Sequence, residues 1–351
     1  MPEGCGPSRR ISVIRYIALT FLLSYSLNLG TGLAFGFRLP ADARTSMITM
    51  MLVPAFSAIV LKMFVEKESE IYFRTFREKT RLFFYFFLLY FAILLTLSVA
   101  SWISPKYVEL ADTITFAMTS LALIFLLILR FMLGQDALRR AGLSFGSPKH
   151  YLLFGSLFVA LYGGMAWLNC NLGLGKPVRL GELLDFPPET GTSGIVSALI
   201  LMGIQAVIVS PFLTLPITFG EEYGWRAYLQ KELMGLVGKA KAALLVGLIW
   251  GVWHAPLVAM GHNYPGYPAE GILLMTAYAV TLSVILGLAF IKSGSVWLVS
   301  YIHGINNQSA SFFNALYCTP THPILSFGVG LYGVAVFAAV AALSLMSKAW
   351  R

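Results

Sequence analysis

Ten apolar segments, each close to the length of a membrane-spanning helix, follow one another along the 351 residues of the chain. A helix needs about 20 apolar residues to cross the hydrocarbon core of a bilayer. Charged residues make up 12% of the composition and mean hydropathy is +0.76, whereas a soluble domain carries about 25% charged residues. We therefore predict an all-α, polytopic transmembrane helix bundle with eight to ten spanning helices, integral to the cell membrane. The segments are Ile17–Phe37, Ser46–Phe64, Leu82–Ile103, Thr113–Leu133, Tyr151–Leu174, Ile195–Phe219, Ala242–Met260, Gly271–Ile291, Ser295–Tyr317 and Ile324–Leu345.

Basic residues are distributed unevenly between the two sides of this arrangement. Five of the 25 Lys and Arg residues fall on one side, and the others fall on the side that holds both chain ends. Because cytoplasmic stretches carry an excess of Lys and Arg, the N- and C-termini are predicted to be cytoplasmic. The net charge of +9 then indicates contact with anionic lipid at the cytoplasmic face. Nucleic acid is not an expected partner, and the oligomeric state is left open. The five residues on the sparse side are Arg38, Arg44, Lys106, Lys176 and Arg179.

The chain has three cysteines, Cys5, Cys170 and Cys318, which are too few for a disulfide framework. We expect three unpaired thiols. The alternative is one bridge between Cys170 and Cys318, which fall on the same predicted side of the membrane.

Ionisable side chains inside a membrane are costly, so those within or beside apolar segments are candidates for function. The first group is Gly220-Glu221-Glu222-Tyr223-Gly224-Trp225-Arg226, directly after the sixth segment. On a helix, Glu222 and Arg226 are four residues apart and share a face, whereas Glu221 lies about 100° away. This spacing separates a structural carboxylate from a chemically active one. The alternative is an interfacial helix start with acids at its positive dipole end.

Two histidines lie within later apolar segments. His254 ends the stretch Trp250-Gly251-Val252-Trp253-His254, and the alternative to a functional role for it is a satisfied core histidine. His303 and Asn307 are four residues apart in His303-Gly304-Ile305-Asn306-Asn307, so they stack on one helix face. The density of polar residues here favours the wall of a water-filled cavity over interhelical hydrogen bonding alone.

Together these side chains suffice for hydrolysis of a peptide bond by a water nucleophile. Glu221 and His254 can act as general base on water, while His303 and Asn307 can donate hydrogen bonds to a developing oxyanion. The absence of an HExxH motif excludes a standard zincin, and no cofactor is expected. A divalent metal such as zinc, held by Glu221, His254 and His303, stays open as an alternative.

The order of the three motifs resembles that of the CAAX prenyl protease and bacteriocin-processing family (CPBP, also called Abi), whose members are intramembrane endopeptidases. Glu221–Arg226 is similar to the first motif of that family. Trp250–His254 is similar to the second, with Trp250 where Phe is usual, and His303–Asn307 is similar to the third. Ala227 stands where the family commonly has Gly. The resemblance covers about Ile195–Phe313.

The resemblance implies that Glu221 and His254 activate water, that His303 and Asn307 stabilise the oxyanion, and that Glu222 and Arg226 support them. It implies a membrane-associated protein or peptide as substrate. We expect one membrane domain over residues 1–351, with N-terminal helices of unassigned role in 1–194, a catalytic core in 195–317 and a C-terminal helix in 318–351.

Two other functions use the same polar groups. A proton-coupled transporter would line its path with them, although the sequence shows no inverted repeat. A non-catalytic, bacteriocin-immunity-type membrane protein would carry a vestigial site, although all six motif residues are intact.

The depth of Glu221 poses a geometric condition. A straight helix over Ile195–Phe219 would leave Glu221 too shallow to reach His254 and His303, so Pro211 and Pro216 are predicted to break that segment. We expect a conical vestibule that opens to the cytoplasm, walled by the sixth, seventh and ninth segments.

Overall fold

The computed structural model of the protein describes residues 6–178 and 191–351 and is almost entirely helical. The predicted all-α fold is confirmed, and eight helices of the described residues are long and apolar enough to cross a membrane. The protein is therefore an integral, multi-pass membrane protein. The helices of the first half are α1 Gly6–Phe35, α2 Arg44–Val60, α3 Arg81–Ile103, α4 Val108–Met132, α5 Gln135–Arg140 and α6 Pro148–Asn171.

The second half holds the segments that carry the polar motifs. α14 covers the eighth predicted segment and α15 covers all but the end residues of the ninth, whereas the sixth and seventh segments are divided into shorter helices. The bounds are α8 Thr192–Ile204, α9 Ser210–Leu213, α10 Leu215–Glu222, α11 Lys231–Val237, α12 Lys239–Trp253, α13 Ala255–Ala259, α14 Pro268–Ser293, α15 Val296–Leu316 and α16 Leu331–Leu345. The π-helices are η2 Leu61–Val65, η4 Gln205–Val209 and η5 Tyr223–Gln230, and the 3-10 turns are η1 Ala41–Ala43, η3 Pro105–Tyr107 and η6 Lys348–Trp350.

Two of the ten predicted segments fall outside the set of eight. α15 is long enough to span, but its polar residues lower its hydropathy. The tenth segment was predicted to begin at Ile324 and begins as a helix only at Leu331, which leaves 15 residues in α16. The reason is local, because Gly328 adopts φ +74° and the chain turns before the helix starts.

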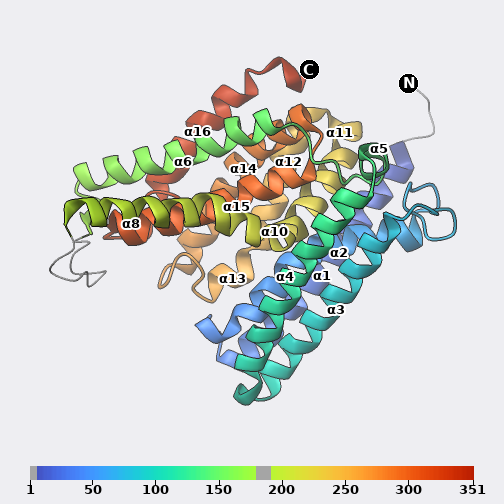
Figure 1. Ribbon diagram of the computed structural model, residues 1–351, viewed down its shortest axis with the longest axis horizontal. Coiled ribbons are helices and arrows are strands. Elements are labelled where there is room, and N and C mark those ends of the chain that lie inside the picture. The colour runs from blue at the N-terminus through green and yellow to red at the C-terminus, as the bar shows by residue number, and fades with distance from the viewer. Residues whose placement is uncertain (1–5, 179–190) are drawn as a thin grey trace.

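α10 lies at the centre of the molecule, between two groups of helices (Figure 1). It packs against α2 on one side and against α15 on the other. Aromatic rings fill this junction: Phe219 stacks on Trp297 of α15 with centroids 4.5 Å apart, and Phe83 of α3 meets Phe219 edge-on at 5.2 Å. The short helix that carries Glu221 and Glu222 is therefore held by both groups.

The connections between helices gather on two opposite faces. The terminal face holds connections 66–80 and 133–147, α11 and the chain end at 346–351, and lies toward the top and right of Figure 1. Its parts contact one another: Arg140 pairs with Glu78 at 2.7 Å, and Lys239 donates to the carbonyl of Arg351 at 2.6 Å.

The opposite face, called here the disulfide face, holds connections 36–43, 104–107, 172–178, 260–267 and 317–330. Strands β1 Gly175–Pro177 and β2 Cys318–Pro320 pair there in an antiparallel ladder. A disulfide joins Cys170 to Cys318 beside this ladder. The prediction of unpaired thiols was wrong for these two residues, because the ladder brings segments 148 residues apart into register. Cys5 lies outside the described residues.

Candidate active site

The sixth segment is broken at the point that the prolines predict. α8 passes into the π-helix η4 and then into α9, and the chain turns at Thr214 before α10 begins. Pro211 and Pro216 each lie in the first turn of a short helix, where the missing N–H of proline costs no hydrogen bond. Glu221 is 2% exposed as a result. The predicted break is confirmed, and Glu221 is buried directly after it.

Two glycines set the rotation of the first motif. A Cβ atom at Gly220 would overlap the backbone of α2 at Leu52, and one at Gly224 would overlap Pro54 of the same helix. Small residues four apart allow two membrane helices to approach closely. With the glycine face against α2, the two carboxylates point to other helices, and η5 continues the motif as a π-helix, a form that is frequent at functional sites.

A second pair of glycines fixes the helix that carries His254. Gly247 and Gly251 of α12 lie against α14, where added Cβ atoms would overlap the Cα atoms of Val280 and Thr276. Trp250, directly before Gly251 on the same helix, is 2% exposed and donates a hydrogen bond to Glu221 of the first motif.

Glu222 is the centre of a buried charged network. Its Oε1 lies 2.9 Å from Nδ1 of His303, and its Oε2 lies 3.1 Å from Nε of Arg226. Glu222 and Arg226 are completely buried, and the guanidinium of Arg226 stands over the Trp250 ring at 5.0 Å. The predicted Glu222–Arg226 pairing is confirmed. The contact with His303 was not predicted, because no local spacing indicates a partner 81 residues away.

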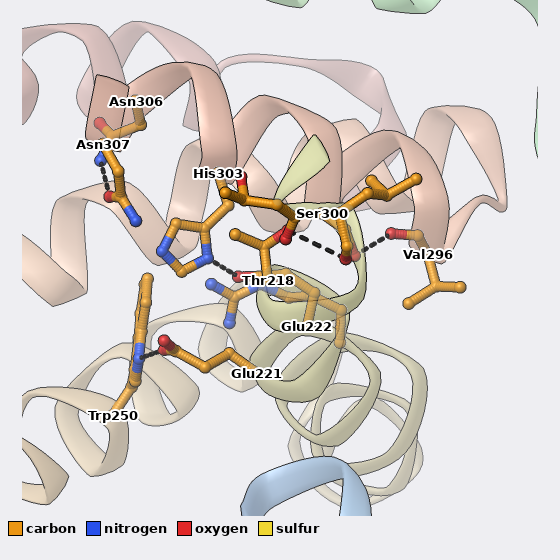
Figure 2. A network of polar contacts seen from close by, with 12 residues as sticks. Thr218, Glu221, Glu222, Trp250, Val296, Ser300, His303, Asn306 and Asn307 are labelled. Atoms are coloured by element: carbon orange, nitrogen blue, oxygen red, sulfur yellow. Dashed lines mark hydrogen bonds and ion pairs between the residues drawn. The ribbon is translucent and has the colours of Figure 1, made fainter. Parts of the chain in front are cut away.

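Glu221 points away from this network. Figure 2 shows its carboxylate directed at Trp250, whose indole N–H donates to Oε2 at 2.7 Å. The carbonyl of Trp250 lies 2.8 Å from Nδ1 of His254. Since a carbonyl can only accept, Nδ1 carries the proton and a neutral His254 keeps Nε2 as an acceptor. The described residues show no direct hydrogen bond between Glu221 and His254, and Trp250 links them.

Asn307 is supported by Asn306, its neighbour in the third motif, and by two tyrosines that sequence reasoning missed. The hydroxyl groups of Tyr162 and Tyr278 approach Oδ1 of Asn306 at 3.1 and 2.8 Å. Nδ2 of Asn306 then donates to Oδ1 of Asn307 at 3.1 Å, as Figure 2 shows. Hydroxyl donors fix the oxygen of Asn306 on one side, so the Nδ2 donor group of Asn307 is the one left free. Single tyrosines in apolar segments give no sequence signal for such a role.

The four predicted catalytic side chains line one cavity of about 380 Å³. Glu221, His254 and His303 are buried, whereas Asn307 is exposed. The walls come from α10, α12 and α15, as predicted, together with α2 and α14. His262 also lines the cavity; sequence reasoning had left it in a connection.

The cavity does not open toward the chain ends. Its exposed wall residues are Arg44, Asn263, Asn307 and Ser311, and the first two stand at or beside connections of the disulfide face. The sequence predicted both cytoplasmic termini and a vestibule open to the cytoplasm. These two predictions cannot hold together, because the opening and the chain ends lie on opposite faces.

The metal alternative was tested on Glu221, His254 and His303. In residues 6–178 and 191–351, no three His, Cys, Asp or Glu side chains gather at a spacing that would hold an ion. Glu221 is bound by Trp250, and Nδ1 of His303 is bound by Glu222. The three side chains named in that alternative are not found as such a group in the described part of the chain.

Comparison with known proteins agrees with the motifs. Residues 196–309 match the model of the family described as type II CAAX prenyl endopeptidase Rce1-like. A protein of Methanococcus maripaludis named CAAX prenyl protease 2 is 40% identical over 52 residues, which are 15% of this chain and 19% of that protein. The chain thus matches about a fifth of the length of this curated relative. No solved structure matches the chain. The part of the chain that carries the three motifs, residues 196–309, is therefore similar to the Rce1-like CAAX prenyl endopeptidase family.

Proposed function

We propose that this protein is an intramembrane endopeptidase that hydrolyses a peptide bond of a membrane-associated protein or peptide. The observation that carries the proposal is the convergence of Glu221, His254, His303 and Asn307 on one cavity within the Rce1-like part of the chain. Buried ionisable groups in a membrane protein mark functional sites by default.

The first step is attack of water on the scissile carbonyl carbon. Glu221 takes a proton from the water as the new C–O bond forms, and His254 orients the same water through Nε2. Trp250 positions both groups, through its indole N–H on Glu221 and its carbonyl on His254. The distribution of hydrogen bonds supports Glu221 as the base, since its neighbour Glu222 is engaged by Arg226 and His303.

The tetrahedral intermediate carries its negative charge on the former carbonyl oxygen. Asn307 donates from Nδ2, and His303 donates from Nε2 when it is doubly protonated. The carboxylate of Glu222 favours that protonated form, because it accepts the hydrogen bond from Nδ1. Collapse of the intermediate breaks the C–N bond, and the proton held by Glu221 passes to the leaving amine.

The two other functions are less well supported. A proton-coupled transporter would need the same polar groups, but the match to an endopeptidase family covers the residues that carry them. A non-catalytic, immunity-type protein would not need Glu222, His303 and Arg226 to be held together in one buried network.

The test is a comparison of newly formed peptide ends in the membrane proteins of cells that express either the wild type or Glu221→Gln. We expect cleavage products that depend on the wild-type protein and are absent with Glu221→Gln. Glu109→Gln is the matched control, because Glu109 is exposed on α4 and does not line the cavity. Identical products from wild type and Glu221→Gln would contradict the proposal.

A further inference from the structure

The cavity is lined by the parts of α2 and α15 that lie toward the disulfide face. On α2 it is lined by residues of the first two turns, from Arg44 to Met51. On α15 it is lined by His303 and by residues nearer the C-terminal end, up to Ser311. Both helix ends adjoin connections of the disulfide face. The opening of the cavity therefore lies on that face, and the buried Glu221 is one of its wall residues.

The distribution of basic residues indicates on which side of the membrane the disulfide face lies. Four of the five basic residues on the sparse side, all except Arg179, lie in the described residues, at connections 36–43, 104–107 and 172–178 or at the start of α2. Two basic residues of the terminal face form ion pairs within it. Lys62 pairs with Glu70 at 2.5 Å, and Arg140 pairs with Glu78. Since Lys and Arg accumulate in cytoplasmic stretches, the terminal face is the cytoplasmic one.

The disulfide independently indicates the same orientation in the membrane. Cys170 and Cys318 are bridged beside β1 and β2, on the face where the cavity opens. Disulfides persist in oxidising compartments outside the cytoplasm and are rare within it. A charge bias and a redox marker therefore agree on one orientation, although they arise from different physics.

We propose that the cavity opens to the extracytoplasmic side of the membrane, and that the substrate is a peptide segment exposed on, or emerging at, that side. The statement about the substrate rests on the proposed endopeptidase function, whereas the orientation does not. Apolar side chains, among them Met47, Leu257 and Met275, line the cavity beside the polar groups. They suit a segment that carries apolar side chains up to the scissile bond.

The orientation is tested by labelling single cysteines in whole cells with a membrane-impermeant, sulfonated maleimide. Cys5→Ser supplies a background in which the two remaining cysteines are bridged. Ser311→Cys reports on the cavity wall, and Glu68→Cys reports on the terminal face; both positions are exposed. Ser300→Cys, at a fully buried position, is the control for non-specific reaction.

We expect Ser311→Cys to react equally in intact and permeabilised cells, and Glu68→Cys to react only after permeabilisation. The background protein is expected to react only after denaturation with a reductant. The reverse pattern, or reaction of both reporters under the same condition, overturns the proposal. Asp42→Cys, at an exposed position between α1 and α2, replaces Ser311→Cys if that variant is not produced.

The same labelling on a Glu221→Gln background separates the two proposals. Orientation does not depend on catalysis, so the labelling pattern is expected to be unchanged. If the cleavage test refutes the endopeptidase function while the labelling pattern is as expected, the proposed orientation still holds. Cleavage restricted to cytoplasmic peptide segments would refute the inference about the substrate but would still support the endopeptidase function.

Discussion

Replacement of Asn306 tests whether the hydrogen-bond relay behind Asn307 contributes to the reaction. Asn306→Leu removes the acceptor of the Tyr162 and Tyr278 hydroxyl groups and the donor to Asn307. The two hydroxyl groups keep each other as partners, 3.0 Å apart. The oxygen of Asn307 loses its donor, and its amide group is free to rotate away from the oxyanion.

The magnitude follows from one lost hydrogen bond. Such a bond contributes about 1 kcal/mol, and about 1.4 kcal/mol corresponds to a tenfold change in rate. We therefore expect kcat to fall about five- to tenfold, with KM unchanged. Complete loss of an oxyanion donor costs more, about 10²- to 10³-fold. Asn307→Ala is accordingly expected to be the more severe change.

The assay is single-turnover cleavage by the purified protein in lipid vesicles, combined with a double-mutant cycle. If Asn306 acts only through Asn307, adding Asn306→Leu to Asn307→Ala lowers kcat no further. Losses that multiply in the double variant would refute the relay. Asn314→Leu, at an exposed position on the same helix, controls for general effects of the substitution, and Tm is measured for each variant.

Three further substitutions test other parts of the site and the fold. Trp250→Phe keeps the aromatic ring but removes the indole donor to Glu221; kcat is expected to fall about tenfold, and an unchanged kcat would refute the positioning role. Gly224→Val places side-chain atoms against α2, and this overpacking is expected to cost about 1–3 kcal/mol of stability and to lower Tm. The control is Gly164→Ala, where the added methyl group enters open space and Tm is expected to stay unchanged. Cys170→Ser opens the disulfide, so Tm in non-reducing buffer is expected to fall to the value that the wild type shows with reductant.

Most of the fold could be predicted because membrane-spanning helices appear in the sequence as long apolar segments. Where the prediction was wrong, a local backbone feature overrode the hydropathy signal. The segment at Ile324 is apolar, yet Gly328 turns the chain and α16 starts at Leu331. The prediction of free thiols for Cys170 and Cys318 failed for another reason, because a two-strand ladder between distant segments leaves no periodic pattern. The division of the chain at residues 194 and 317 stays a prediction.

The site was predictable where its contacts are local. Four-residue spacing indicated the Glu222–Arg226 pair, and proline placement indicated the break that buries Glu221. The contact between Glu222 and His303 and the role of Trp250 depend on how α10, α12 and α15 cross, which spacing within one segment cannot encode. That the cavity opens on the face opposite the chain ends was missed for the same reason.

The rate of peptide-bond cleavage with and without the Glu221 carboxylate shows whether this side chain is the general base of the reaction. The measurement is single-turnover cleavage of an identified substrate by wild type, Glu221→Gln and Glu109→Gln in lipid vesicles. The account predicts that Glu221→Gln loses at least about 10²-fold in rate, the contribution of a positioned general base, while Glu109→Gln cleaves like the wild type. Cleavage by folded Glu221→Gln at the wild-type rate would contradict it.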